Sequence, residues 1–377
     1  MSNKGYFFII CIKIFKHIGW WNMSIESYLL EKLSKVLFLE IKKESKINDF
    51  KFVENTFLPV RGDEIVDKAK AGENLEHIPV NMFIEGMFYV LGADKEFKFN
   101  ETYKKLIQHV PNSDRFIKGI IFKYIKEEKY EDAYILLRGL LEMDESKEVF
   151  DKALLLVDAL RNKNNNFKDE ELNLIQRGKA ISNYTKPYYY EALIKRDDKD
   201  FQGALYAVNQ YISLGGQVTE EVSELKTSLN TITEYDKGKE MVYEAPKEAL
   251  KILLPLVDTL GDSAEIYYFI AVGYRVLENF EKAVYYLNEA LAISSDYIEV
   301  VNELGINHAC LGNYDFAIQY FRKAFEVTKS IEICTNLIMC YININDTTQA
   351  KLHLEIAKKL DSKDEIVLEL EGILSKS

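Results

Sequence analysis

Residues 264–297 read AEIYYFIAVGYRVLENFEKAVYYLNEALAISSDY, and the same pattern returns in residues 298–330 and 331–364. Each unit alternates small residues with aliphatic or aromatic ones at fixed spacing. In the first unit these positions are Tyr267, Ile270, Ala271, Tyr274, Ala283, Leu287 and Ala290. A period near 34 residues with this distribution predicts pairs of helices that stack into an array.

The small residues of the pattern predict close contact between helix backbones, with the larger residues filling the remaining space. They are Ala271, Ala283, Ala290, Gly305, Ala317, Ala324, Ala350 and Ala357. None of these side chains is reactive, so the pattern describes packing and indicates no chemistry.

On these residues the chain resembles the tetratricopeptide repeat (TPR) family over residues 264–364. The resemblance implies an all-α fold, a helix-turn-helix repeat solenoid that forms a right-handed superhelix. It also implies that the first helix of each repeat lines a concave groove, where segments of partner proteins bind.

The composition supports a helical protein and limits the kinds of partner that it can bind. Only 6 prolines and 18 glycines interrupt 377 residues, too few for a turn-rich fold of many strands. The formal net charge of −12 opposes binding to phosphate backbones, so we expect no nucleic-acid partner. Four cysteines are too few for a disulfide framework and suggest a reducing compartment, so we expect a cytoplasmic protein.

The first 22 residues differ from the rest of the chain. They contain three lysines and no acid around an apolar run that is too short to span a membrane. Met23 then precedes an amphipathic pattern. Residues 1–22 are therefore either a non-native leader upstream of a true start at Met23 or a basic N-terminal extension, and an atypical export signal and an ordinary helix also stay open. We expect membrane contact only if this segment is real and acts as an anchor.

Residues 23–110 predict a mostly helical N-terminal region that is less regular than the rest. A helix is expected over residues 25–43. Residues 47–66 predict an irregular connection and no helix, because they contain Pro59 and Gly62. The tripeptide Arg61-Gly62-Asp63 matches an adhesion motif, but such a match arises easily by chance.

The repeats predict the remaining domain organisation. Degenerate TPR-like repeats are expected over residues 111–230. Ala204 and Ala249 are 45 residues apart, which predicts a register change or hinge around residues 214–231. The more regular array then covers 231–364, with units near 231–263, 264–297, 298–330 and 331–364. Residues 365–377 predict a helix that caps the final apolar face.

No reactive constellation is visible in the sequence. A Gly-rich phosphate loop, a His-Glu-x-x-His motif and a Cys-x-x-Cys motif are all absent, and the five histidines are dispersed. His308 occupies the repeat position of Tyr274 and Tyr341, which indicates a core aromatic substitute. We therefore predict no catalytic residue, no cofactor and no metal site.

By repeat position, the resemblance supplies candidates for a partner-binding groove. They are Tyr268, Val272 and Arg275, then Asn302, Ile306 and Ala309, then Thr335, Met339 and Ile342. The best-known subfamily binds terminal carboxylates through a clamp of lysines, arginines and asparagines, but Tyr268 stands where the clamp lysine belongs. The mixture suits an apolar peptide or helix face better than a carboxylate.

Three functions stay open at this point. The first is an adaptor that binds a protein or peptide partner of unknown identity in the repeat groove, without catalysis. The second is a peptide-sensing regulator that is switched by closure of the superhelix. The third is an enzyme, or an enzyme-targeting subunit, with its chemistry in residues 23–110. We favour the adaptor, because the repeats that the sequence shows are enough to account for it.

Overall fold

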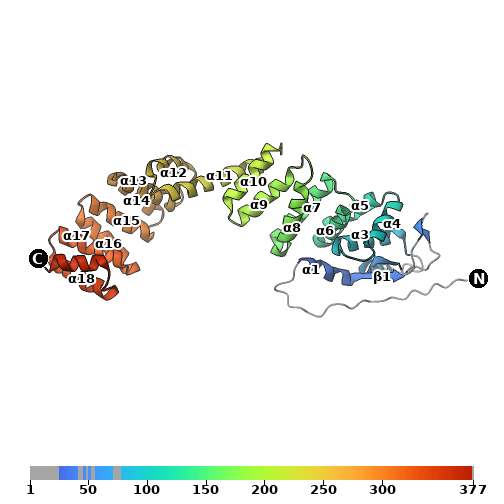
Figure 1. The fold of residues 1–377 in the computed structure, drawn as a ribbon, viewed down its shortest axis with the longest axis horizontal. Coiled ribbons are helices and arrows are strands. Elements are labelled where there is room, and N and C mark those ends of the chain that lie inside the picture. Colours follow the sequence, from blue (N-terminus) through green and yellow to red (C-terminus); the bar gives the residue numbers. More distant parts are fainter. Residues whose placement is uncertain (1–24, 41–45, 48–49, 52–55, 71–77, 376–377) are drawn as a thin grey trace, which may run out of the picture. The chain divides into compact units, whose positions relative to one another are not determined.

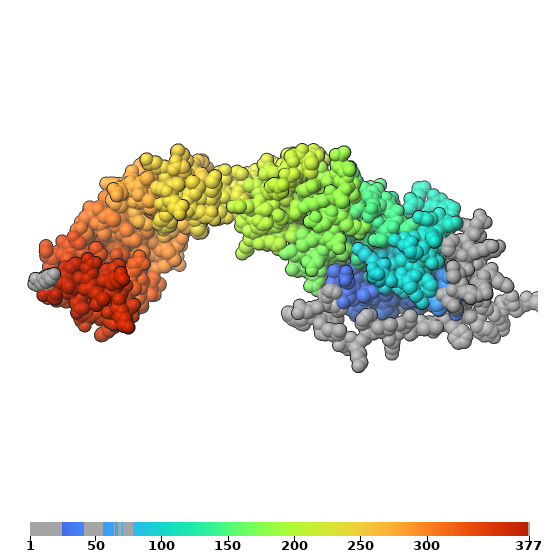
Figure 2. All heavy atoms as spheres, viewed as in Figure 1, coloured from blue at the N-terminus to red at the C-terminus, as the bar shows by residue number. Residues whose placement is uncertain are grey.

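In the computed structural model, helices make up most of the described part of the chain (Figure 1). The residues it describes are 25–40, 46–47, 50–51, 56–70 and 78–375. The choice between Met1 and Met23 lies outside them. The chain divides after Thr219 into two compact units, here called the N-terminal unit and the C-terminal unit. The helices of each unit are closely packed in the space-filling view (Figure 2).

The N-terminal unit begins with a short helix and a strand where the sequence predicts one long helix. The helix α1 (Ile25–Lys32) and a 3-10 turn (Leu33–Lys35) are followed by β1 (Val36–Glu40), which pairs antiparallel with β4 (Phe57–Arg61). The helix predicted over residues 25–43 is therefore wrong for residues 36–40, and residues 41–43 lie outside those that the structure describes. A short apolar run suits a helix or a strand equally well, and pairing with β4, whose Leu58 and Val60 are fully buried, decides for the strand.

The connection predicted over residues 47–66 is partly extended and partly helical. Besides β4 it contains the short strands β2 (Lys46–Ile47) and β3 (Phe50–Lys51), which pair with each other. Pro59 fits into β4 because this strand has β1 as its one partner among the described strands. The helix α2 (Gly62–Lys70) begins where the sequence predicts no helix, so that part of the prediction is wrong.

Glycines bring the helix α3 (Val80–Ala93) into backbone contact with its neighbours. A Cβ atom on Gly86 would lie 2.1 Å from the carbonyl oxygen of Pro59 in β4. One on Gly92 would lie 1.8 Å from the carbonyl oxygen of Ile135 in α6 (Tyr130–Leu141), and Gly139 faces α3 in the same way. No side chain fits at these crossings, so glycine is required there.

The other helices of the N-terminal unit follow as neighbouring pairs joined by short turns. After α4 (Asn100–His109) the pairs are α5 (Ser113–Lys126) with α6, α7 (Lys147–Lys163) with α8 (Lys168–Lys179), and α9 (Lys186–Asp197) with α10 (Phe201–Ser213). A 3-10 turn (Asn165–Phe167) separates α7 from α8. The degenerate part of the chain thus also consists of stacked helix pairs.

The C-terminal unit contains four helix pairs and a final helix. The pairs are α11 (Glu220–Met241) with α12 (Pro246–Leu260), α13 (Ala264–Val276) with α14 (Phe280–Ile293), α15 (Ile298–Cys310) with α16 (Tyr314–Thr328), and α17 (Ile331–Asn343) with α18 (Thr347–Leu360). The helix α19 (Glu365–Leu374) packs on α17 and α18 and buries Val367, Leu370 and Leu374. The all-α repeat solenoid predicted from the sequence is confirmed.

The small residues of the repeat lie in the core of the C-terminal unit. Every alanine of the pattern is fully buried: Ala271, Ala283, Ala290, Ala317, Ala324, Ala350 and Ala357. Gly305 lies under the ring of Phe321, and a Cβ atom there would approach that ring to 2.6 Å. Small side chains at these positions therefore set how closely the helices approach.

A left-handed residue recurs in the turn within the helix pairs. Five residues before the repeat alanine, φ is positive at Glu128, Lys199, Glu278, Gly312 and Asn345. The amide of the following residue donates, at 2.9 Å, to the carbonyl five residues back, near the end of the preceding helix. Three of these turns are in the C-terminal unit and two in the N-terminal unit, so both units share one turn although only one of the five residues is glycine.

In each of the three regular repeats one ring of the first helix contacts one ring of the second, stacked in the first two repeats and tilted in the third. The pairs are Tyr274 with Tyr286, His308 with Tyr320, and Tyr341 with His353. Ring centroids are 5.1 to 5.5 Å apart, within the range of favourable aromatic contacts. His308 thus takes the aromatic position that the sequence predicts, although it is half-buried and not in the core.

Candidate interaction surfaces

The first helices of the three regular repeats, α13, α15 and α17, expose most of the predicted partner-binding residues. Neighbouring first helices contact each other, α13 with α15 and α15 with α17. Met339 is 49% exposed, and the other surface members are half-buried: Tyr268, Arg275, Asn302, Ile306, Ala309 and Ile342. We call these seven residues the first-helix surface. Their role in binding stays a prediction.

Two predicted members are not at the surface. Val272 is fully buried in contact with Val242 and Ala249 of the preceding repeat, and Thr335 is 2% exposed. The hydroxyl of Thr335 donates to the carbonyl oxygen of Glu332 within its own helix. The prediction that these two side chains face a partner is wrong, because contacts within the stack cover them.

A buried ion pair joins α13 to α15 at this surface. The Nε of Arg275 donates to the carboxylate of Glu303, whose side chain is 6% exposed, whereas that of Arg275 is 26% exposed. Asn307 is fully buried and also donates to this carboxylate, at 3.3 Å. Burial raises the pKa of Glu303, and Arg275 and Asn307 counteract this. The pair holds the Arg275 guanidinium in place, with part of it in solvent.

Aromatic side chains surround Tyr268 at the N-terminal end of the first-helix surface. Its ring contacts Tyr297 with centroids 5.6 Å apart and Phe269 at 5.1 Å. Burial raises the pKa of Tyr268, so its phenol stays protonated. This part of the surface therefore offers an aromatic face and a neutral hydroxyl group.

The sequence does not single out Glu303 and Asn307, yet a signal is present. When the repeats are aligned, Glu303 takes the position of Phe269 and Asn307 that of Gly273. Two polar residues thus replace apolar or small ones at positions that face the preceding repeat. Such an exchange at a packing position indicates a polar contact between repeats.

Of three comparisons with known proteins, only the one with solved structures gives matches. No protein-family model matches the chain, and no curated protein does. A crystal structure of MamA aligns at 22% identity over 48% of this chain and 92% of its own, with a TM-score of 0.36. YrrB, described as a TPR protein with an unusual peptide-binding site, aligns at 17% over 52% and 96%, with a TM-score of 0.36.

A third match is TTC0263, a thermophilic TPR protein in Thermus thermophilus, at 17% identity over 51% of this chain and 97% of its own, with a TM-score of 0.31. Scores this low support no conclusion by themselves. The spacing, the helix pairs and the shared turn of this chain are decisive. The chain has the tetratricopeptide repeat fold.

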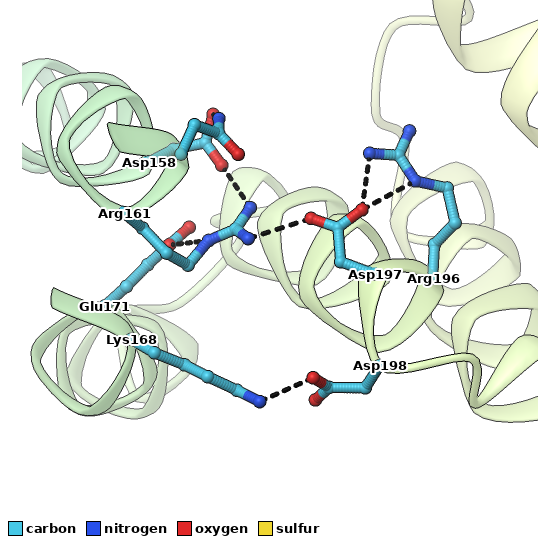
Figure 3. A network of polar contacts seen from close by, with 8 residues as sticks. Asp158, Arg161, Lys168, Glu171, Arg196, Asp197 and Asp198 are labelled. Carbon is cyan, nitrogen blue, oxygen red and sulfur yellow. Dashed lines mark hydrogen bonds and ion pairs between the residues drawn. The ribbon is translucent and has the colours of Figure 1, made fainter. Parts of the chain in front are cut away.

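The repeats of the N-terminal unit contain a buried charge cluster (Figure 3). The guanidinium of Arg161 on α7 donates to Asp158 at 2.8 Å, to Glu171 of α8 at 2.7 Å and to Asp197 of α9 at 2.8 Å. Glu171 is fully buried, and burial raises its pKa to about 7 although Arg161 opposes the rise. The cluster ties three helices together, and the ion pairs Arg196–Asp197 and Lys168–Asp198 lie beside it nearer the surface (Figure 3).

A second cluster accounts for the Arg61-Gly62-Asp63 tripeptide. Arg61 is 2% exposed, its guanidinium lies 4.2 Å from the centre of the Tyr89 ring, and it donates to Asp63 at 2.7 Å and to Asp132 at 3.4 Å. An adhesion tripeptide must present its arginine to a receptor. Arg61 is part of the core, so the match to that motif is a chance one.

A cavity of about 260 Å³ lies where α6 begins and α7 ends. Its lining includes Glu131 and Asp132, but Glu131 pairs with Lys32, and Asp132 accepts from Arg61 and from the Tyr89 hydroxyl. Within the described ranges no three His, Cys, Asp or Glu side chains are placed to hold a metal ion, and no helix is long and apolar enough to cross a membrane.

The two units differ in charge. Residues 220–377 contain 27 acidic and 15 basic residues, whereas residues 1–219 contain 33 of each. The whole net charge of −12 therefore belongs to the C-terminal part of the chain. Its field attracts cationic partners and repels anionic ones.

Proposed function

We propose that this protein is a scaffold that binds a segment of a partner protein along the first-helix surface of its C-terminal unit. The observation that carries the proposal is the exposure of Tyr268, Arg275, Asn302, Ile306 and Met339 at corresponding places on consecutive first helices. Aromatic, arginine and methionine side chains are frequent anchors in interfaces.

The partner segment is apolar where it meets Ile306 and Met339 and carries basic residues beside that stretch. The apolar part follows from the side chains of the surface, and the basic part follows from the net charge of the unit. Asn302 adds an amide oxygen that is buried without a hydrogen-bond partner among the described residues, and a donor on the partner would satisfy it.

The proposal assigns no catalytic role. The titratable groups of the two buried clusters in the N-terminal unit are paired with one another, so they stabilise the stack. The peptide-sensing regulator and the enzyme with chemistry in residues 23–110 stay predictions, and no observed feature favours either one.

Affinity capture with three forms of the full chain tests the proposal. The surface variant combines Tyr268→Ala, Asn302→Ala and Met339→Ala. The control combines Tyr285→Ala, Phe316→Ala and Leu352→Ala on the second helices. These side chains are 58%, 55% and 55% exposed, more than Met339 at 49% and the half-buried Tyr268 and Asn302. We expect the wild type and the control to capture the same partner and the surface variant to bind it about tenfold more weakly.

Two results contradict the proposal. If the control variant loses the partner and the surface variant keeps it, binding occurs on the second helices. If both variants keep the partner and a chain lacking residues 23–110 loses it, the site lies in the N-terminal region. Circular dichroism must show unchanged helix content in both variants for either result to count.

A further inference from the structure

The exposed face of α5 is basic and surrounds an exposed aromatic ring. If Ala133 is matched to Ala317, the residues of α5 that correspond to Glu299, Asn302, Ile306, Ala309 and Cys310 of α15 are Arg115, Lys118, Phe122, Ile125 and Lys126. Phe122 is 59% exposed and Ile125 is 36% exposed. Lys118, Phe122 and Ile125 thus take the positions of Asn302, Ile306 and Ala309 of the first-helix surface, and Arg115 and Lys126 lie beside them with a different chemistry.

Much of the positive charge on this face is not neutralised. Among the described residues, Arg115 and Lys126 have no carboxylate within ion-pair distance. Lys118 pairs with Asp144 at 3.5 Å, and Lys123 pairs with Glu127 at 3.9 Å, so Arg115 and Lys126 carry the unpaired charge of the face. The Nζ of Lys126 lies 4.7 Å from the centre of the Phe122 ring, so that ring already has a cation beside it.

The charge of α5 is opposite to that of the first helices in the C-terminal unit at one repeat position. Where α5 has Arg115, the helices α13, α15 and α17 have Glu265, Glu299 and Glu332. The basic residues of α5 also stand out in a unit whose total charge is neutral. The local excess of positive charge is therefore a property of this helix face.

We propose that the α5 face is a second docking surface, separate from the one in the C-terminal unit, and that it binds an acidic segment of a partner protein. An apolar side chain of the segment covers Phe122 and Ile125, and its carboxylates pair with Arg115 and Lys126. A guanidinium binds a carboxylate through two parallel hydrogen bonds, so Arg115 fixes the position of the segment as well as its charge.

The size and borders of the face favour a short peptide over a larger anionic surface. From Arg115 to Lys126 the helix rises about 17 Å, the length of about five residues of extended chain. Asp114 precedes the face and Glu127 and Glu128 follow it, all of them exposed. A nucleic-acid duplex or an anionic membrane would bring phosphates against these carboxylates, whereas a segment of this length avoids them.

Fluorescence anisotropy with the full chain tests the proposal. The probe is a labelled synthetic peptide of alternating glutamate and leucine, measured at low and at moderate salt. The test variant combines Arg115→Glu and Lys126→Glu. The matched control combines Lys105→Glu and Lys199→Glu, which change the net charge equally at exposed lysines of the same unit. A third variant, Phe122→Ser, removes the ring and keeps every charge.

We expect the test variant to weaken peptide binding at least about tenfold and the control to change it less than about twofold. Phe122→Ser should weaken binding about fivefold without changing its salt dependence, because a ring contributes no charge. These results would support an acidic segment bound at α5. The side chains changed in the test variant and the control are exposed, so melting should stay close to that of the wild type.

Equal loss of binding in the test variant and the control would overturn the proposal, because the affinity would then reflect net charge alone. Absence of peptide binding at low salt would also overturn it. If Arg115→Glu with Lys126→Glu instead abolishes binding of phosphatidylserine vesicles or self-association of the chain, a membrane or a second copy occupies the face, and the acidic segment is rejected.

Discussion

Replacing Glu171 by glutamine tests whether a fully buried carboxylate in the Arg161 cluster titrates near neutrality. Burial raises the pKa of Glu171 from 4.5 to about 7. A carboxyl group with a raised pKa binds more protons in the folded state than in the unfolded state, so stability falls as pH rises from about 4.5 to 7. The difference between these two pKa values corresponds to at most about 3 kcal/mol above pH 7.

Glutamine has nearly the same shape and no charge to desolvate. Its amide oxygen can still accept from the Nε of Arg161, and Arg161 keeps Asp158 and Asp197, each at 2.8 Å. We therefore expect Glu171→Gln to be more stable than the wild type by about 1–3 kcal/mol at pH 8. The two proteins should be equally stable near pH 5, where the wild-type carboxyl is protonated as well.

Urea denaturation followed by circular dichroism, repeated between pH 5 and pH 8, measures this difference. The transition of the N-terminal unit is the relevant one, because repeat arrays need not unfold in a single step. Asp198→Asn is the control, since Asp198 is an exposed neighbour that pairs with Lys168 (Figure 3). A variant that is less stable than the wild type at pH 8, or a difference that does not change with pH, would refute the reasoning.

Four further variants address the C-terminal unit. Ala283→Trp and Ala317→Trp place an indole at fully buried helix contacts, so each should destabilise by about 1–3 kcal/mol or more, and an unchanged melting temperature would contradict the packing role. Glu278→Gly should stabilise by about 1 kcal/mol in thermal melts, because its φ of 58° suits glycine; a loss of stability would contradict this. Burial lowers the pKa of His308, so its contribution to stability is lost as pH falls below 6.5, and His308→Tyr should melt with less dependence on pH between 7 and 5 than the wild type.

The regular repeats could be predicted from the sequence because one rule recurs three times. Each unit buries its alanines and larger residues against the next, so a fixed spacing in the sequence implies a fixed contact in space. The final helix was predictable for the same reason, since its apolar stripe had to cover an exposed end. It was predicted within residues 365–377, and α19 covers Glu365–Leu374.

The beginning of the chain was harder to predict because its structure depends on distant partners. Val36–Leu39 becomes a strand through pairing with a segment some twenty residues further on, and no periodicity within either segment shows that pairing. The charge clusters around Arg61 and Arg161 likewise join helices whose contacts a local pattern does not contain.

Repeat position alone also gave an incomplete candidate surface. Val272 and Thr335 occupy surface positions of the general pattern but are buried in this stack. The α5 face was missed because its repeat is degenerate, and the candidates came from the three regular units. Matching Ala133 to Ala317 finds it, since Phe122 then takes the position of Ile306 on the first-helix surface.

Because a left-handed residue lies five positions before each repeat alanine, whole repeats can be removed or added at equivalent turns. The backbone passes Glu278 and Gly312 in similar conformations, with the same hydrogen bond closing each turn. An in-frame deletion of residues 279–312 would therefore join α13 to α16 through a turn of unchanged shape. The shortened protein would lose Glu303 and release Arg275 from its buried pair, while the alanine contacts of the remaining helices would still find equivalent partners. Exchange of whole units at these turns can thus lengthen, shorten or recombine the array without the design of a new loop.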